Sequence, residues 1–178
     1  MISLDHRLEE WVVHHRVSWL DDVFVWISRL GRVGWTLIVV ALVATFVLRS
    51  PRIFLLVLSS AIVADQLARA IKEAVGRQRP LFGPGDPHPL VRMPTDPSFP
   101  SGHASASFAA AVALALAVPR LAVPALVFAA AVAYSRLYLG VHFPLDVIGG
   151  AVLGAAVAIA LRWLAEALWP SRPRQRAS

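Results

Sequence analysis

The 178-residue sequence contains no cysteine, so neither disulfide bonds nor thiolate metal sites are possible. Charged residues are also scarce, at 16% of the chain, whereas an average soluble domain has about 25%. Hydrophobic residues make up 57%, and the mean hydropathy is +0.63. The chain also lacks an internal repeat or low-complexity tract that would divide it. These features predict one compact domain of a membrane protein over residues 1–178.

Acidic residues are fewer than basic ones, which gives a formal net charge of +6 and a pI near 11.2. The basic residues do not gather into one stripe with interleaved aromatic residues, as a nucleic-acid surface would need. Several lie at the ends of apolar runs and in the final stretch SRPRQRAS, where anionic lipid headgroups suit them better. We therefore expect membrane lipids, and no nucleic acid, as partners.

Five apolar stretches approach the roughly 20 residues that a helix needs to cross a bilayer. The second is interrupted by Asp65 and Arg69, which lie four residues apart and should pair inside the bundle. The predicted fold is all-α, an integral membrane helical bundle of about five transmembrane helices. They cover residues 33–48, 53–71, 104–118, 121–138 and 143–164.

The first 32 residues have a different pattern. Leu4, Leu8, Trp11 and Val12 recur at helical spacing among charged residues, which is typical of amphipathic helices in the membrane interface. The alternative is a sixth span over residues 17–32, which three charged residues make unfavourable. The segment also lacks the apolar core of a cleavable signal peptide. We predict interfacial helices over 1–32, a transmembrane core over 33–168 and a basic cytoplasmic tail over 169–178.

Seven prolines between residues 76 and 100 predict an irregular loop outside the hydrocarbon. With five spans, this loop, the start of the third span and the connection between the fourth and fifth share one side. The positive-inside rule makes the opposite side cytoplasmic if the basic residues on the loop side are held there by function. Those residues are Arg29, Arg32, Lys72, Arg77, Arg79, Arg92 and Arg136. The residues on the opposite side include Arg49, Arg52, Arg120 and Arg162. Groups on the loop side would then face the periplasm or the cell exterior of a bacterial-type plasma membrane.

Three polar clusters meet on the loop side: KEAVGRQRP (72–80), PSGH (100–103) and SRLYLGVHFPLD (135–146). Their excess of cations suits a phosphate, whose oxygens match guanidinium groups. If Ser101 caps the third helix, the N–H groups of Gly102 and His103 point to the same place. Taken alone, the Ser-Gly pair would be an ordinary N-cap. The cations are Lys72, Arg77, Arg79 and Arg136.

His142 and Asp146 lie four residues apart on one helical face, so the carboxylate can hold one imidazole nitrogen and leave the other free. This is the arrangement of a nucleophile or base with its orienting group. A chain break near Gly140 would let Arg136 converge with His142. By itself, the His-x-x-x-Asp pattern would indicate a surface ion pair, and only the other two clusters favour a catalytic role.

Together the clusters resemble the signature of the type 2 phosphatidic acid phosphatase (PAP2) superfamily, which includes membrane lipid phosphatases and the soluble vanadium haloperoxidases. The resemblance implies that His142 is the nucleophile that forms a phosphohistidine and that Asp146 orients it. It implies that His103 protonates the leaving group and then activates water, with no metal and no cofactor. The implied phosphate contacts are Lys72, Arg79, Ser101, the Gly102 amide and Arg136. The matching patterns are Lys72-x6-Arg79-Pro80, Pro100-Ser101-Gly102-His103 and Ser135-Arg136-x5-His142-x3-Asp146.

The leading interpretation is hydrolysis of a phosphomonoester or pyrophosphate on a membrane lipid, such as undecaprenyl pyrophosphate, phosphatidylglycerophosphate or phosphatidic acid. One alternative is a vanadate-dependent haloperoxidase, but those relatives are soluble and the apolar spans argue against it. Another is a non-catalytic lipid-phosphate binding or transport protein, which would not need the His-His-Asp set. The pattern Gly150-x3-Gly154 permits close helix packing within the chain, and it leaves the oligomeric state open.

Overall fold

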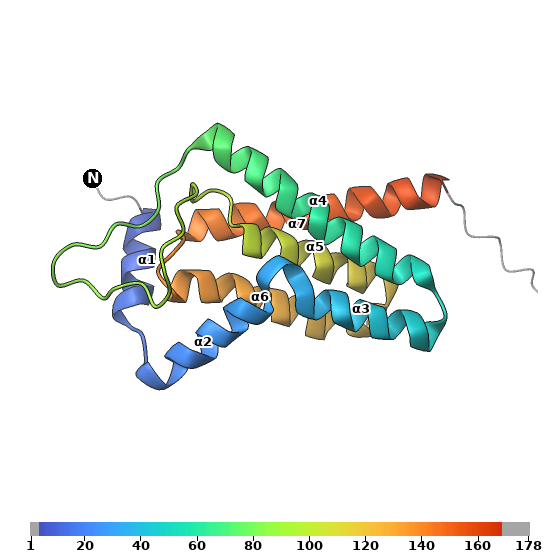
Figure 1. Cartoon of the computed structure of the whole chain (residues 1–178), viewed down its shortest axis with the longest axis horizontal. Helices are drawn as coiled ribbons and strands as arrows, with labels where there is room; N and C mark the ends of the chain where they lie inside the picture. The colour runs from blue at the N-terminus through green and yellow to red at the C-terminus, as the bar shows by residue number, and fades with distance from the viewer. Residues whose placement is uncertain (1–3, 169–178) are drawn as a thin grey trace, which may run out of the picture.

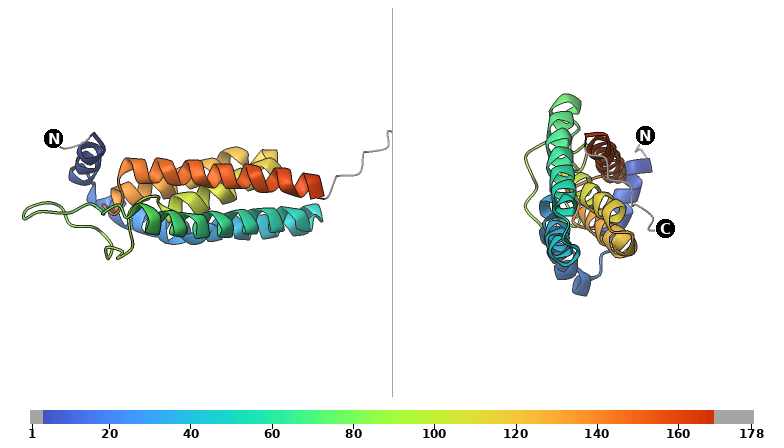
Figure 2. Two further views of the ribbon diagram at one scale, coloured as in Figure 1. Left: turned by 90° about the horizontal axis from the view of Figure 1, so that it is seen from above. Right: turned by 90° about the vertical axis from the view of Figure 1, so that its right-hand side faces the viewer.

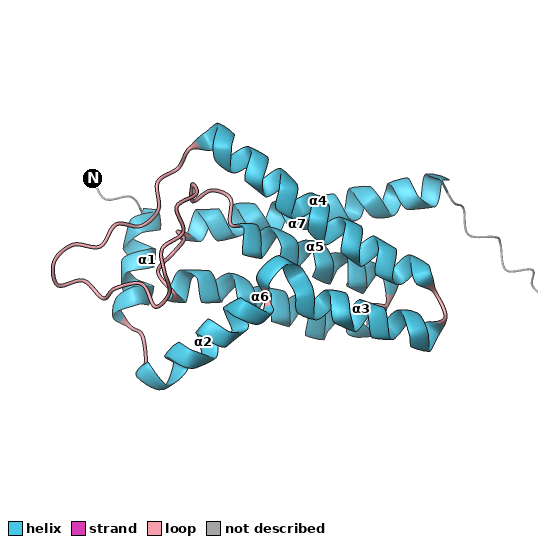
Figure 3. Cartoon of the chain, in the orientation of Figure 1, coloured by secondary structure: helices cyan, strands magenta, loops and turns pink. Residues whose placement is uncertain are grey.

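The computed structural model describes residues 4–168, and every regular element among them is a helix (Figure 3). The predicted all-α class is confirmed. The predicted basic tail, residues 169–178, lies outside the described residues. In chain order the elements are α1 (Leu4–His14), α2 (Ser18–Leu30), the 3-10 turn η1 (Arg32–Gly34), α3 (Trp35–Leu48), α4 (Pro51–Val75), α5 (Gly102–Ala117), the 3-10 turn η2 (Pro119–Leu121), α6 (Ala122–Tyr138) and α7 (Pro144–Leu168).

Helices α3 to α7 run along the long axis of the molecule, and α1 lies across one end of this bundle (Figure 1). Helix α5 packs against α4, α6 and α7, which places it at the centre of the bundle. The connection between α4 and α5 projects from the end where α1 lies (Figure 2). This end, called the loop end below, therefore collects α1, the proline-rich loop and the first turns of α5 and α7.

Proline and glycine mark several helix boundaries. Pro51 and Pro144 stand in the first turns of α4 and α7, where a missing N–H leaves no helical hydrogen bond unmade. Gly76 ends α4 with φ of 64°, a left-handed conformation that glycine adopts without a Cβ clash. Each predicted span therefore corresponds to one helix, with its ends shifted by a few residues.

The predicted count of five transmembrane helices is not confirmed. Helix α4, the segment Pro119–Tyr138 and α7 are long and apolar enough to cross a bilayer. Helix α5 has 16 residues, which is about 24 Å of helix against a hydrocarbon core of about 30 Å. Because α5 lies inside the bundle, neighbouring helices surround it in place of lipid, and its length need not match the bilayer.

The N-terminal segment enters the bundle through a bend. Helix α2 packs against α6, and it meets the following segment Arg32–Leu48 at an angle of 52°. By length, α2 and this segment could together form a fourth span. The bend lies at Val33 and Gly34, whose φ values of 53° and 71° are left-handed. The interfacial position of residues 1–32 stays a prediction.

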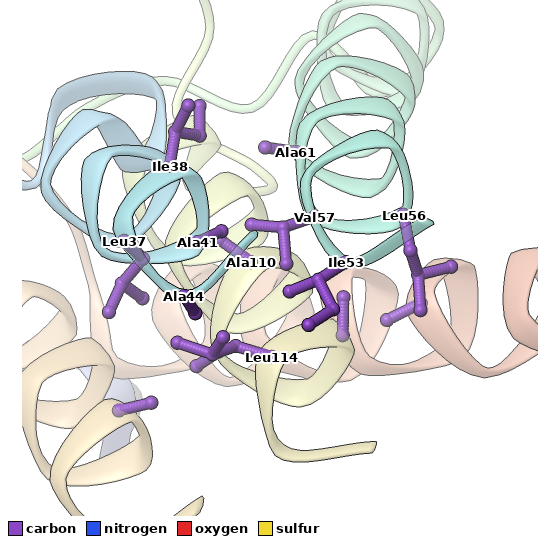
Figure 4. Close-up of a cluster of buried hydrophobic side chains, with 14 of the residues drawn as sticks. Leu37, Ile38, Ala41, Ala44, Ile53, Leu56, Val57, Ala61, Ala110 and Leu114 are labelled. Carbon is purple, nitrogen blue, oxygen red and sulfur yellow. The ribbon is translucent and has the colours of Figure 1, made fainter. Parts of the chain in front are cut away.

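A core of small and branched side chains holds α3, α4 and α5 together (Figure 4). Ala41, Val57 and Ala110 contribute no exposed surface, and each comes from a different helix of the three. Small residues at such contacts let helix backbones approach closely, which is the main source of helix association where lipid surrounds the bundle.

Helices α5 and α7 also approach each other closely, and this contact depends on glycine. A Cβ atom added at Gly154 would lie 2.1 Å from the carbonyl oxygen of Ser105, and one added at Gly150 would lie 2.5 Å from that of Ser101. The predicted Gly-x3-Gly packing is therefore confirmed, and it occurs inside one chain. It places the first turn of α5 beside the first turns of α7.

We expect Gly154→Ala to destabilise the protein by about 1–3 kcal/mol, because the new methyl group overlaps the α5 backbone. This loss should outweigh the gain in helix propensity, which is about 1 kcal/mol. Thermal unfolding in detergent would measure it. Ala156→Val, at an exposed position of the same helix, is the control and should leave the midpoint unchanged. A midpoint for Gly154→Ala at or above that of the wild type would contradict the proposed close approach.

Candidate active site

A cavity of about 430 Å³ opens at the loop end, where the three predicted clusters meet. It takes residues from the end of α4, the proline-rich loop, the first turn of α5, the end of α6 and the turn before α7. Two of the eight predicted site residues, Ser101 and Asp146, are fully buried behind the lining. The other six line it: Lys72, Arg79, Gly102, His103, Arg136 and His142.

The turn between α6 and α7 brings His142 to the cavity. Helix α6 ends at Tyr138, and Gly140 reverses the chain with φ of 73°. A side chain there would be strained, because non-glycine residues rarely adopt such a φ. The break that we predicted near Gly140 is therefore confirmed, and Arg136 and His142 now line the same cavity.

Asp146 holds the imidazole of His142 from behind. Its Oδ2 lies 3.4 Å from His142 Nδ1 and also accepts hydrogen bonds from the Phe143 N–H (2.9 Å) and the Ser98 hydroxyl. The other imidazole nitrogen, Nε2, lies 3.2 Å from Arg79 Nη1 and faces the cations. Burial and the charges of nearby cations lower the pKa of His142, although the bond to Asp146 acts in the opposite direction. The imidazole is therefore neutral near pH 7 and can act as a nucleophile.

Asp96 bridges the two cations Lys72 and Arg79, and it was not identified as a site residue from the sequence. The carboxylate of Asp96 accepts from Lys72 Nζ at 2.7 Å and from Arg79 Nη2 at 2.9 Å. Burial alone would raise the pKa of Asp96, but the hydrogen bonds and charges of the two cations outweigh it and lower the pKa to about 2. No sequence signal marked Asp96, because it is one polar residue in a polar loop and its partners lie 24 and 17 positions earlier.

Arg136 reaches the cavity from α6 and is almost completely buried. Its Nη1 donates to the hydroxyl of Ser28 on α2, a contact between residues 108 positions apart that the sequence did not indicate. Its Nε has no hydrogen-bond partner within the described part of the chain. Helix α2 therefore orients one arm of the guanidinium group.

The start of α5 has the predicted capped geometry. Ser101 is the N-cap, and its hydroxyl accepts from the Ala104 N–H at 3.5 Å. Its own N–H donates to the backbone oxygen of Asp146 at 2.9 Å. Gly102 and His103 then begin the helix and line the cavity. The N-cap role of Ser101 is confirmed, whereas its contact with phosphate stays a prediction.

The lining of the cavity includes the predicted ion pair of α4. Arg69 Nε lies 2.9 Å from Asp65 Oδ2, and both residues line the cavity. The pairing predicted from their spacing is therefore confirmed, but the Arg69 side chain is mostly exposed and does not lie inside the bundle. Arg32, at the bend between α2 and α3, also lines the cavity and lies close enough to His103 for its charge to act on that imidazole. The sequence did not indicate Arg32, because only the bend directs it there.

This arrangement suits chemistry on a phosphate group. A neutral imidazole held from behind faces several cations, and a second histidine lines the same cavity. Among residues 4–168, His, Asp and Glu side chains form no group of three that could hold a metal ion. Phosphoryl transfer needs mainly positioning and stabilisation of charge, which these cations and helix N–H groups can supply.

Comparison with known proteins gives consistent matches. The profile described as the PAP2 superfamily matches residues 35–170. An undecaprenyl-diphosphatase of Sulfolobus acidocaldarius is 32% identical over 88% of this chain and 76% of its own length. A decaprenylphosphoryl-5-phosphoribose phosphatase of Mycobacterium tuberculosis is 40% identical over 74% of this chain and 72% of its own.

Two solved structures are also similar. The transmembrane PAP2-type phosphatidylglycerolphosphate phosphatase of Bacillus subtilis superposes with a TM-score of 0.77 at 28% identity, covering 96% of this chain and 87% of that one. LpxE of Aquifex aeolicus superposes with a TM-score of 0.74 at 26% identity, covering 91% and 96%.

Asp96 occupies the two cations that a phosphate would need, so its charge should compete with a bound oxyanion. We expect Asp96→Asn to bind orthovanadate roughly fivefold more tightly, which corresponds to about 1 kcal/mol. Titration calorimetry of the purified protein would measure the dissociation constant. Asp86→Asn is the control: it also removes one negative charge from this loop, but away from the cavity, and it should leave the dissociation constant unchanged. Equal or weaker binding by Asp96→Asn would show that the two anions do not compete.

Proposed function

The chain belongs to the PAP2 superfamily, and on that basis we propose that it is a multi-pass membrane phosphatase that hydrolyses a lipid phosphate or diphosphate. The observation that carries this proposal is the position of His142, which Asp146 holds so that its free nitrogen faces Arg79 inside a cation-lined cavity. A haloperoxidase-like oxidation has no comparable support, because the relatives described above are named phosphatases and diphosphatases.

In the first step, His142 Nε2 attacks phosphorus in line with the bond to the leaving oxygen. A P–N bond forms as the P–O bond breaks, and His103 donates a proton to the departing oxygen. Asp146 stabilises the positive charge that develops on the His142 ring through its contact with Nδ1. The product is a phosphohistidine and a lipid alcohol, or a lipid monophosphate when the substrate is a diphosphate.

In the second step, water attacks the phosphohistidine. His103, now without its proton, accepts a proton from the water, the P–N bond breaks, and inorganic phosphate leaves with His142 restored. In both steps the three equatorial oxygens carry negative charge that needs fixed donors. We assign these donors as Lys72, Arg79, Arg136, the Gly102 N–H and Ser101.

The cavity favours a substrate with a second anionic group beside the scissile phosphate. Arg32 and Arg69 line it in addition to the cations of the signature, and Arg32 lies on the side of His103, where the leaving group departs. The side chain of Arg32 makes no hydrogen bond or ion pair with another of residues 4–168. A diphosphate would place its outgoing phosphate there. We therefore favour a polyprenyl-type diphosphate, such as the substrate that the name of the Sulfolobus relative states.

We place the active site on the non-cytoplasmic face of the membrane. The end of the bundle opposite the loop end carries Arg49, Arg52 and Arg120 at or next to helix ends, and Arg162 lies in the last two turns of α7. The loop end carries basic residues as well, but Lys72, Arg79 and Arg136 line the cavity there, and we assign them to phosphate binding. The arginines in the short connections at the opposite end are typical of the cytoplasmic side. The loop end, with the cavity, would then face the periplasm or the exterior.

The two histidines should differ in how they respond to the leaving group. His142→Ala should abolish phosphate release from every substrate and form no acid-labile phosphoenzyme. The rate of phosphate release from a lipid phosphate should fall roughly 10²–10⁴-fold in His103→Ala, because the alkoxide needs a proton to leave. The rate of phosphoenzyme formation from p-nitrophenyl phosphate should fall much less, because p-nitrophenolate departs without a proton. Equal losses on both substrates would show that His103 is not the general acid.

Arg32→Gln should discriminate between diphosphate and monophosphate. We expect kcat/KM for farnesyl diphosphate to fall roughly tenfold, because a charge-assisted hydrogen bond contributes about 1.5–3 kcal/mol. The value for farnesyl monophosphate should change less than twofold. Arg29→Gln removes an arginine outside the cavity and serves as the control. Equal losses on both substrates would mean that Arg32 does not contact the outgoing phosphate.

A further inference from the structure

A second arginine of the α4–α5 connection, Arg77, lies outside the catalytic cavity and joins two carboxylates. Its Nη1 lies 2.7 Å from Asp146 Oδ1, and its Nη2 forms an ion pair with Asp5 of α1. The guanidinium carbon stands 4.5 Å from the centre of the Phe143 ring, which covers one face of the group. Arg77 is therefore held in position on three sides.

The two oxygens of Asp146 have different partners because of Arg77. Oδ2 interacts with the imidazole and accepts from Ser98 and the Phe143 N–H. Oδ1 accepts from Arg77 alone among the described residues. Without Arg77, a buried carboxylate oxygen would lose its hydrogen bond, and the carboxylate could rotate about its side-chain bond. Arg77 thus determines which oxygen is presented to His142.

Asp5 in turn determines where Arg77 lies. It is buried although it stands in the first turn of α1. Its Oδ1 accepts from the Leu145 N–H at 2.9 Å, in the first turn of α7. Its Oδ2 binds Arg77. One carboxylate therefore ties α1 both to the helix that carries Asp146 and to the arginine that holds it.

We propose that Asp5 and Arg77 are positioning residues for the phosphatase reaction, and that the chain Asp5–Arg77–Asp146 orients the nucleophile His142. Through this chain α1 is required for turnover although it touches no reacting atom. Asp5 lies outside residues 35–170, the region that the PAP2 profile matches. The inference rests on the proposed function, because it concerns the rate at which His142 attacks phosphorus.

The test compares Asp5→Asn with Glu10→Gln, which removes an acidic charge from an exposed position of the same helix. We expect Asp5→Asn to lower kcat roughly 10–100-fold, as misplaced catalytic groups do. KM and the dissociation constant of vanadate should stay within twofold, because the phosphate-binding cations are untouched. Asp5→Glu should recover most of kcat, and Glu10→Gln should match the wild type.

A double variant tests whether Asp5 acts on Asp146 through Arg77 or whether Asp5 and Arg77 make independent structural contacts. If Asp5 acts only through Arg77, Asp5→Asn/Arg77→Gln should be no slower than Arg77→Gln alone. If the fold-losses in kcat of the two single variants multiply in the double variant, the proposal is overturned. A parallel loss of kcat and vanadate binding would overturn it as well, because that result indicates general disruption of the site.

Two further outcomes keep the test decisive. If Asp5→Asn does not fold, Arg77→Lys takes its place, since lysine retains the charge but cannot bridge two carboxylates with a planar fork; an unchanged kcat would then refute the inference. If the wild type releases no phosphate from lipid phosphates, the proposed function fails. If the wild type is active and Asp5→Asn equals Glu10→Gln, only the positioning role fails.

Discussion

The buried carboxylate of Asp146 is the interaction on which the geometry of the cavity depends. It has no exposed surface, and a charge in such a place is stable only with several donors, because burial removes its water. Its donors come from the loop and from the turn before α7, and its backbone oxygen binds the start of α5. The hydrogen bonds that make burial of Asp146 possible are therefore the ones that assemble the cavity.

Positive charge is concentrated at the loop end of the molecule, and the proline-rich loop helps to neutralise it. Lys72, Arg79 and Arg136 lie around one cavity, and their mutual repulsion opposes that arrangement. Asp96 neutralises part of this charge from the loop, and Ser28 binds Arg136 from α2. A phosphate would supply the same negative charge at the reacting position, so the arrangement that is unfavourable without an anion favours binding of one.

Local spacing was enough to predict much of the fold and several site contacts. The apolar runs located helices α3 to α7, since hydropathy over a stretch of residues depends on that stretch alone. The capping role of Ser101, the Asp65–Arg69 pair and the His142–Asp146 contact all join residues at most four positions apart. Helical geometry brings such residues together whatever the rest of the chain does. The sequence also indicated eight site residues, six of which line one cavity.

Contacts between distant segments required the tertiary structure. Arg77 with Asp5, Arg136 with Ser28 and Asp96 with two cations join residues that no periodicity relates, because their positions depend on how whole helices and the loop pack. The predicted number of spans is not confirmed for a related reason: hydropathy does not distinguish a helix that faces lipid from α5, which other helices enclose. The sequence by itself determined the helices and the chemical groups of the site. Only the packing of α1, α2 and the loop decided which of those groups hold one another in place, since that depends on contacts across the whole bundle.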